Sequence, residues 1–131
     1  MERDVGLLIL GHGSTLPYNK ALVEALAEMI GKKHPGPIRT AYLNANQPQI
    51  PDGLKSFAGT NVHSIVALPL FLAHGVHTTE DIPRELGIAR GESRGSINLD
   101  GREVEILCAQ PLGVDECIAT LAYQRAVESL K

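Results

Sequence analysis

The sequence contains no tryptophan, few other aromatic residues and no excess of positive charge. Two phenylalanines and three tyrosines occur among its 131 residues, and the formal net charge is −3 at pH 7. A surface that binds nucleic acid needs a positive field and commonly uses stacking rings. The composition therefore argues against a nucleic-acid partner.

Long hydrophobic runs are missing as well, although 44% of the residues are hydrophobic. No stretch approaches the roughly 20 consecutive apolar residues that cross a bilayer. Residues 1–4 (MERD) lead directly into a short apolar run rather than into the pattern of a signal peptide. We therefore expect a cytoplasmic protein with no membrane partner and a hydrophobic core of ordinary size.

Cysteine is scarce. Cys108 and Cys117 show neither Cys-x-x-Cys spacing nor the several pairs that a disulfide framework requires. We predict that both are buried thiols rather than metal ligands.

The chain does contain a regular alternation of apolar runs and helical patterns. Predicted strands cover residues 5–10, 38–43, 64–71 and 104–109, and predicted helices cover 19–33, 50–57, 79–86 and 115–130. This alternation predicts an α/β fold in one domain, residues 1–131, built as a three-layer α/β/α sandwich with a four-stranded parallel sheet. Residues 88–103 are polar and glycine-rich and are expected to form a mobile loop. In the last helix, the residues predicted to face the sheet are Ile118, Leu121 and Ala122.

Two turns that contain histidine and glycine follow the first and third predicted strands. Their sequences are Gly11-His12-Gly13-Ser14 and Ala73-His74-Gly75-Val76-His77. Parallel sheets bind ligands beyond the carboxyl ends of their strands, often at the point where the strand order reverses. We therefore expect His12 and His77 to face one crevice, whereas His34 and His63 lie outside these turns.

Several chemistries that use such turns lack a required residue here. A histidine phosphatase would carry arginine before the His-Gly pair, but Gly11 occupies that position. Ser14 lacks the Gly-x-Ser-x-Gly elbow of serine hydrolases, and no Gly-x-x-x-x-Gly-Lys loop is present to hold a phosphate. Imidazole acting as a base or as a metal ligand remains.

The two turns resemble motifs of the small archaeal class II tetrapyrrole chelatases, the sirohydrochlorin nickelchelatase and cobaltochelatase family. The resemblance rests on residues 9–14 (ILGHGS), on residues 69–83 (PLFLAHGVHTTEDIP) and on residues 110–113 (QPLG), and it covers essentially the whole chain. It implies a lyase that inserts a divalent ion into sirohydrochlorin. Within the family, the second motif is most similar to nickel chelatases that serve methanogenesis, which makes nickel the first choice and cobalt, for cobalamin biosynthesis, the second.

By resemblance, His12 is the proton acceptor and a metal ligand, and His77 is the second metal ligand. Neutral imidazole suits both tasks, since it binds nickel and cobalt and titrates near neutral pH. We infer from its position that Glu80 relays protons. The expected substrate-binding residues are Ser14, Gln47, Leu72, Ala73, His74, Gly75, Val76 and His77, with Arg84, Arg90 and Arg94 as candidates for the carboxylate rim of the macrocycle.

No permanently bound cofactor is expected, because the divalent ion is a substrate. A single lobe of 131 residues would leave the ring half exposed, so we expect a homodimer that closes the cavity. The alternatives are a sirohydrochlorin ferrochelatase and a carrier of metal or tetrapyrrole that does not catalyse insertion.

Overall fold

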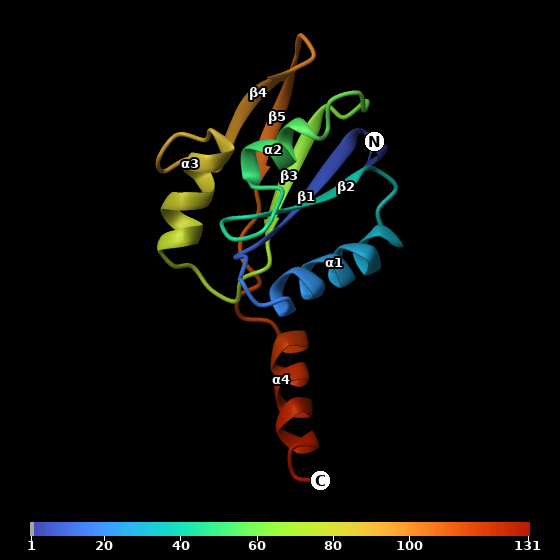
Figure 1. The fold of residues 1–131 in the computed structure, drawn as a ribbon, viewed down its shortest axis with the longest axis vertical. Helices are drawn as coiled ribbons and strands as arrows, with labels where there is room; N and C mark the ends of the chain where they lie inside the picture. The colour runs from blue at the N-terminus through green and yellow to red at the C-terminus, as the bar shows by residue number, and fades with distance from the viewer. Residues whose placement is uncertain (1) are drawn as a thin grey trace.

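The computed structural model describes residues 2–131, which form a five-stranded sheet in the order β2-β1-β3-β5-β4 (Figure 1). The strands are β1 (Val5–Gly11), β2 (Ile38–Tyr42), β3 (Ser64–Pro69), β4 (Arg94–Leu99) and β5 (Arg102–Cys108). β2, β1, β3 and β5 pair in parallel, and β4 pairs with β5 in the antiparallel direction. The predicted class of α/β fold is confirmed, with one strand more than expected.

Helices cover both faces of the sheet, as the alternating sequence predicts. The helices are α1 (Tyr18–Gly31), α2 (Ile50–Lys55), α3 (Ile82–Leu86) and α4 (Glu116–Glu128), with a 3-10 turn at Glu2–Asp4 and a π-helical turn at His77–Asp81. On one face, Val23 and Ala27 of α1 pack against Ile9. On the other face, α2 and α3 pack against Leu8 and neighbouring residues of the sheet. Two cores of unequal size result, one on each face.

A strand forms where a loop was expected in residues 88–103. β4 alternates between exposed and more buried positions, and a two-residue turn, Asp100-Gly101, joins it to β5. Both turn residues have positive φ (52° and 81°), as in the primed turns that match the twist of a hairpin. The expectation of a loop throughout this segment is therefore wrong, because β4 has the alternating pattern of a strand with only one covered face.

α4 does not pack against the sheet of its own chain. None of its residues is buried, and the helix projects beyond the carboxyl ends of the parallel strands (Figure 1). The prediction that Ile118, Leu121 and Ala122 face this chain's core is wrong: Ile118 is half-buried and the other two are exposed. Cys117, predicted to be buried, is exposed for the same reason, whereas Cys108 is half-buried at the end of β5.

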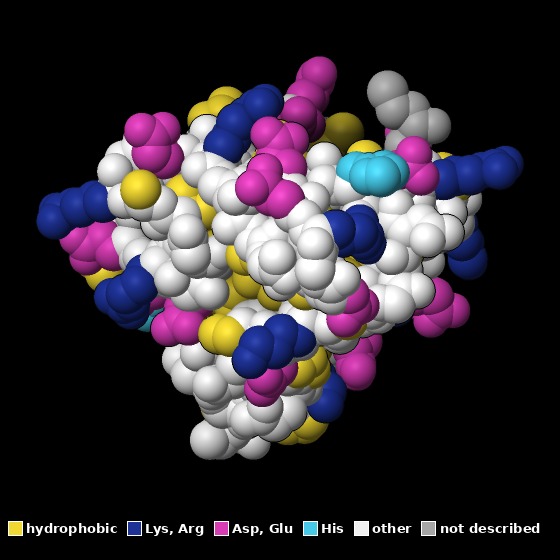
Figure 2. All heavy atoms as spheres, turned by 90° about the horizontal axis from the view of Figure 1, so that it is seen from above, with side chains coloured by type: hydrophobic (Ala, Val, Ile, Leu, Met, Phe, Trp, Pro, Cys, Tyr) yellow, Lys and Arg dark blue, Asp and Glu magenta, His cyan; other side chains and the backbone are white. Residues whose placement is uncertain are grey.

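The end of the molecule opposite α4 shows a mixed surface. Basic and acidic side chains are interspersed over this face, without a broad patch of either sign (Figure 2). Within residues 2–131, none of the helices combines the length and hydropathy of a transmembrane segment.

Candidate functional site

The loop after β1 holds His12 in a fixed, exposed position. Gly13 has a φ of 87°, and a Cβ atom there would lie 1.8 Å from the carbonyl oxygen of Asn44. The Gly13 amide donates a hydrogen bond to Oδ1 of Asn19 (2.9 Å), and the Asn44 amide donates to the carbonyl of His12 (3.2 Å). Glycine is therefore required at position 13, because the loops after β1 and β2 approach each other closely here.

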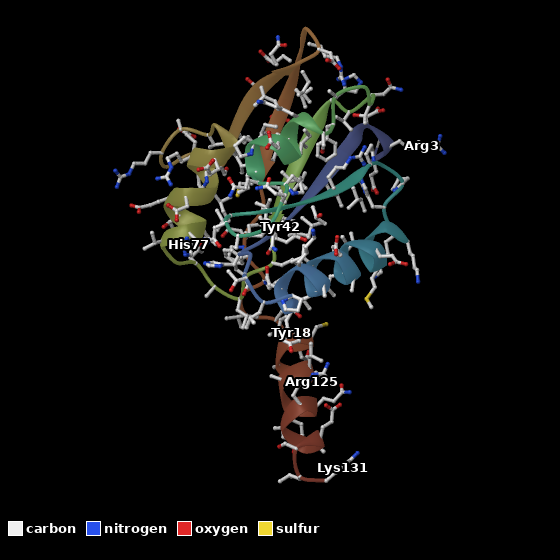
Figure 3. All side chains as sticks on the ribbon, in the orientation of Figure 1. Arg3, Tyr18, Tyr42, His77, Arg125 and Lys131 are labelled. Carbon is white, nitrogen blue, oxygen red and sulfur yellow. The ribbon has the colours of Figure 1, made fainter. Side chains whose placement is uncertain are left out.

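The loop after β3 turns directly into the π-helical turn that carries His77. The hydroxyl of the buried Thr78 accepts a hydrogen bond from the Gly75 amide (2.8 Å), and the Thr79 hydroxyl donates to the Gly75 carbonyl (2.8 Å). π-helical turns are rare and occur frequently at functional sites. His77 lies at the first position of this turn, near the carboxyl edge of the sheet (Figure 3).

The two loops bring His12 and His77 together, 65 positions apart in the sequence. Their Nε2 atoms are 3.1 Å apart, with ring centroids separated by 4.7 Å. Nδ1 of His12 lies 3.1 Å from the Gly13 carbonyl, and Nδ1 of His77 lies 2.6 Å from Oδ2 of Asp81. Because each Nδ1 faces an acceptor, each neutral ring carries its proton there and directs an Nε2 lone pair toward the other ring.

Two converging lone pairs need a cation between them, either a proton or a metal ion. For an ion about 2.0–2.1 Å from each nitrogen, the 3.1 Å separation corresponds to an N–metal–N angle of about 100°. This angle is compatible with two adjacent ligands of a four-coordinate or a six-coordinate ion. Among residues 2–131, no cluster of three or more His, Cys, Asp or Glu side chains could hold a metal. The pair therefore leaves most coordination positions open to other ligands.

Asp81 orients His77, and the sequence analysis did not select it. It accepts from His77 Nδ1 and also from Nη2 of Arg84 (3.1 Å). The hydrogen bond from His77, supported by the charge of Arg84, lowers the pKa of the Asp81 carboxyl below its ordinary value of 3.8. Asp81 is therefore an anion at neutral pH and fixes both the tautomer and the angle of the His77 ring. The i,i+4 spacing of these two residues on a helix was the signal in the sequence.

Glu80 lies apart from the histidine pair. Its carboxylate is 3.9 Å from the guanidinium of Arg90, and within the described part of the chain it forms no hydrogen bond or ion pair with His12 or His77. It lines a surface pocket of about 430 Å³ beside α3, together with Arg84 and Arg90. The carboxylate in contact with His77 is thus that of Asp81, and a proton relay through Glu80 stays a prediction.

His74 is held by other side chains instead of facing His12. Its Nε2 donates to Oε1 of Gln110 (2.7 Å), and its Nδ1 lies 3.2 Å from the Thr78 hydroxyl. Both ring nitrogens are therefore engaged within the protein, and His74 links the loop after β3 to the segment after β5. Gln110 was identified in the sequence only as part of a motif, because no local pattern indicates a contact across 36 residues.

The remaining predicted substrate residues surround the histidine pair with exposed loops. Residues 72–77 are all exposed, including Leu72 and Val76, each with 64% of its surface accessible. Other exposed apolar side chains belong to the loops after β1 and β5 and to the first residue of α1; they are Leu16, Leu112, Val114 and Tyr18. Several exposed apolar side chains close together are typical of a surface that binds a ligand or a partner.

Ser14 and Gln47 belong to the two loops that meet beside His12. The Ser14 amide donates to Oδ1 of Asn46 (2.9 Å), and its hydroxyl accepts from the Leu16 amide (3.1 Å). Gln47 is exposed and precedes a cis peptide bond to Pro48. Ser14 and Gln47 thus lie in loops that are hydrogen-bonded to each other.

Of the three arginines expected near a carboxylate rim, Arg84 and Arg90 line the pocket beside α3. Arg94 lies on β4 and pairs with Glu105 of β5 at 3.3 Å. The expected loop is therefore wrong at Arg94, which lies on a strand, and a contact of its exposed side chain with the carboxylate rim stays a prediction.

The sheet order and the paired histidines at its carboxyl edge define a chelatase-like α/β lobe. The CbiX family model matches residues 6–129. The chain belongs to the CbiX family, and the predicted relationship to the small class II chelatases is confirmed.

Curated relatives share this whole length. The chain is 43% identical over 129 residues to a sirohydrochlorin cobaltochelatase of Methanococcoides burtonii, covering 98% of each chain. It is 32% identical to a protein of the same name from Methanothermobacter thermautotrophicus, covering 96% of this chain and 93% of the relative.

Solved structures show the same fold. A CbiX protein from Marinobacter aquaeolei, described as a putative cobalamin biosynthesis protein, has a TM-score of 0.66 at 22% identity and covers 96% of this chain and 97% of its own. The sirohydrochlorin chelatase SirB from Bacillus subtilis, in complex with cobalt, has a TM-score of 0.71 at 23% identity. The match covers 95% of this chain and 50% of SirB.

Proposed function

We propose that this protein is an enzyme that inserts a divalent metal ion, nickel or cobalt, into sirohydrochlorin. The observation that carries the proposal is the 3.1 Å approach of two imidazole Nε2 atoms whose Nδ1 atoms both face acceptors. The names of the curated relatives support sirohydrochlorin as the substrate and cobalt as an ion. The resemblance of residues 74–83 to nickel chelatases supports nickel as the first choice.

The open coordination of the site suits transfer of an ion rather than permanent binding. Two imidazoles hold the ion at neutral pH but leave positions for the pyrrole nitrogens that replace them. Nickel and cobalt both accept imidazole ligands, and a site without thiolates does not retain them as firmly as a structural centre would. The exposed apolar rim formed by residues such as Leu72 and Val76 supports docking of a flat ring beside the ion.

Insertion releases two pyrrole N–H protons for each ion that enters the ring. As the ion leaves the protein, the Nε2 lone pairs that held it become free to accept protons. We assign the first proton to Nε2 of His12 on the resemblance to the class II chelatases, with His77, oriented by Asp81, as the second ligand of the ion. Two imidazolium groups 3.1 Å apart would repel each other, so His12 passes one proton to solvent before the second arrives.

Turnover tests this function. The purified protein is incubated without oxygen with excess sirohydrochlorin and Ni²⁺, Co²⁺ or Fe²⁺, and the absorption spectrum of the macrocycle is followed. Many metallated rings per chain are expected with nickel and cobalt. One ring or fewer per chain would identify a carrier, and preference for ferrous ion when the three ions compete would identify a ferrochelatase. Initial rates are compared, because affinity alone follows the general order of divalent ions at nitrogen sites.

We also propose that two copies enclose the macrocycle, because the histidine pair lies at an exposed edge with few ligands of its own. A second copy related by a two-fold axis would cover the ring from its other side.

A further inference from the structure

The pocket beside α3 is formed where the chain reverses direction after this helix. It has a volume of about 430 Å³ and is lined by Thr79, Glu80, Pro83, Arg84, Ile88 and Arg90. Gly87 has a φ of 78°, and the Ile88 amide donates to the Pro83 carbonyl (2.8 Å), so the following segment turns back along α3. Ile88 is buried in the larger core and anchors that segment. As a result, Arg90 lines the same cavity as Arg84.

Positive charge exceeds negative charge among the side chains of this pocket. Within residues 2–131, Arg84 donates a single hydrogen bond, from Nη2 to Oδ1 of Asp81 (3.1 Å), and its side chain is 68% exposed. Arg90 is 92% exposed and lies 3.9 Å from Glu80, beyond hydrogen-bonding distance. Exposed ion pairs of this kind contribute little to stability. Because each guanidinium has five N–H donors, both arginines keep donors free for an anion.

The lining of the pocket favours a carboxylate that is attached to a short carbon chain. Guanidinium groups bind the planar oxygens of carboxylates through paired, charge-assisted hydrogen bonds. Pro83 and Ile88 add an apolar part to the wall beside the two arginines. An acetate or propionate arm combines the same two properties, because its stem is aliphatic and its end is anionic. The macrocycle of the proposed reaction carries such arms around its rim.

Arg84 also connects the pocket to the histidine pair. Asp81 accepts from Arg84 through Oδ1 and from Nδ1 of His77 through Oδ2 (2.6 Å). His77 begins the π-helical turn that continues into α3 (Figure 3), and Thr79 and Glu80 of this turn line the pocket. The pocket therefore begins next to the ion site, where the side arms of a ring centred on the ion can reach it.

We propose that Arg84 and Arg90 bind one carboxylate arm of the macrocycle and that Glu80 competes with this arm for Arg90. The pocket then selects rings that carry acidic arms, and the competition with Glu80 limits how tightly the arm is held. This inference rests on the proposed function, since the ligand is the ring that receives the ion. It gives Glu80 a role in the affinity for the ring, which measurements can separate from a role as a proton relay.

The first test measures binding of sirohydrochlorin without metal, through the fluorescence of the macrocycle. Arg90→Gln should raise the dissociation constant about fivefold, because an exposed charge-assisted hydrogen bond is lost. Glu80→Gln should lower it about twofold, because the competing carboxylate is removed. The control is Lys33→Gln, which removes the same charge as Arg90→Gln at an exposed residue after α1, and the end of α1 lies far from α3 (Figure 1). Equal effects of Arg90→Gln and Lys33→Gln, or weaker binding by Glu80→Gln, would overturn the proposal.

The second test changes the ligand instead of the protein. In the matched ligand, the carboxylates of the ring are converted into methyl esters. Arg90→Gln should weaken binding of the acid but not of the ester, which completes a double-mutant cycle between protein and ligand. Equal losses with both ligands would contradict recognition of an acidic arm. Glutarate tests a free dicarboxylate as the ligand, and wild-type affinity for glutarate equal to that for the ring would also overturn the proposal.

Steady-state insertion separates this inference from the proposed function. In Arg90→Gln, the KM for sirohydrochlorin should rise while kcat stays within about twofold of the wild type, because the pocket lies outside the histidine pair. A wild type that metallates no more than one ring per chain would contradict the proposed function, and the metal-free binding measurements would still decide the role of the pocket. Unchanged ring binding in Arg90→Gln, with normal turnover of the wild type, would contradict the pocket alone. For Glu80→Gln, a fall in kcat with an unchanged dissociation constant would indicate a proton relay instead of competition.

Discussion

The imidazole of His12 is exposed and contributes nothing to either core, so its removal tests the chemistry separately from folding. We expect His12→Ala to lose most of the insertion activity and to retain the wild-type melting temperature within a few degrees. The measurements are the initial rate of insertion and thermal unfolding followed by circular dichroism. Activity within about threefold of the wild type would show that another group accepts the proton.

His77 and His74 are three positions apart but have different surroundings. His77 directs Nε2 toward His12, whereas both nitrogens of His74 contact Thr78 or Gln110. His77→Ala should therefore abolish insertion and weaken nickel binding, while His74→Ala should reduce stability and retain much of the nickel affinity. Isothermal titration with nickel and thermal unfolding of both variants provide the comparison. A greater loss of nickel affinity for His74→Ala would reverse the assignment.

Asp81 gives a prediction that separates it from its neighbour Glu80. Asp81→Asn removes the anion that accepts from His77 Nδ1, so the ring can adopt the other tautomer and lose its Nε2 lone pair. We expect nickel affinity to fall by about 10-fold or more. Glu80→Gln is the control of the same chemical type, and it should change the affinity much less because Glu80 faces Arg90. Similar losses in both variants would indicate a general charge effect instead.

The sequence predicted that His12 and His77 belong to one site, but it did not predict the side chains that contact the histidines of this region. His12 and His77 could be selected because each follows a buried strand in a glycine-containing turn. Asp81 and Gln110 act through contacts with other side chains, and these depend on the π-helical turn and on the path after β5. The i,i+4 spacing of His77 and Asp81 was the available signal for Asp81, whereas no local sequence pattern indicates the contact of Gln110 with His74.

Among the structural elements, the loop after β1 restricts the choice of residue most strongly, at position 13. Gly13→Ala would combine a left-handed backbone with a Cβ atom 1.8 Å from the Asn44 carbonyl. We expect a loss of about 1–3 kcal/mol from the backbone conformation alone, with a further loss from displacement of the Asn44 loop. Gly75→Ala is the matched control, because a Cβ atom there meets nothing within 4 Å. Chemical denaturation of both variants measures the difference, and equal stabilities would show that the loop adapts without cost.

The elements that the sequence predicted correctly are those whose burial follows a simple period. β1 and β3 are nearly continuous apolar runs, β2 and β5 contain shorter apolar stretches, and α1 has apolar residues at helical spacing. β4 was missed because its exposed face, with Arg94, Ser96 and Asn98, makes the segment polar on average. Asp100-Gly101 was the available hairpin signal. α4 was predicted correctly as a helix. Its sequence does not indicate whether its apolar residues pack against the sheet of the same chain.

Over the whole molecule, the functional groups gather at one end. The loops after β1, β2, β3 and β5 and the start of α4 all lie at the carboxyl edge of the sheet (Figure 1). The parallel sheet makes this placement predictable, since its strands end together. The direction of α4 away from that edge follows the hydrogen bonds of Leu112 and Gly113 rather than a periodic pattern.

The projection of α4 also affects how the protein acquires its native state. If the exposed side chains of α4 are buried only against the second copy proposed above, the last step of folding is a bimolecular encounter, and its rate depends on protein concentration. After dilution from denaturant, burial of the α4 side chains should slow in proportion as the protein is diluted, while formation of the sheet keeps a constant rate. Stopped-flow fluorescence of a dye on Cys117, compared with far-ultraviolet circular dichroism, would separate the two phases. A single phase independent of concentration would mean that each chain completes its fold alone, and the delay predicted here would be greatest where newly made chains are scarce.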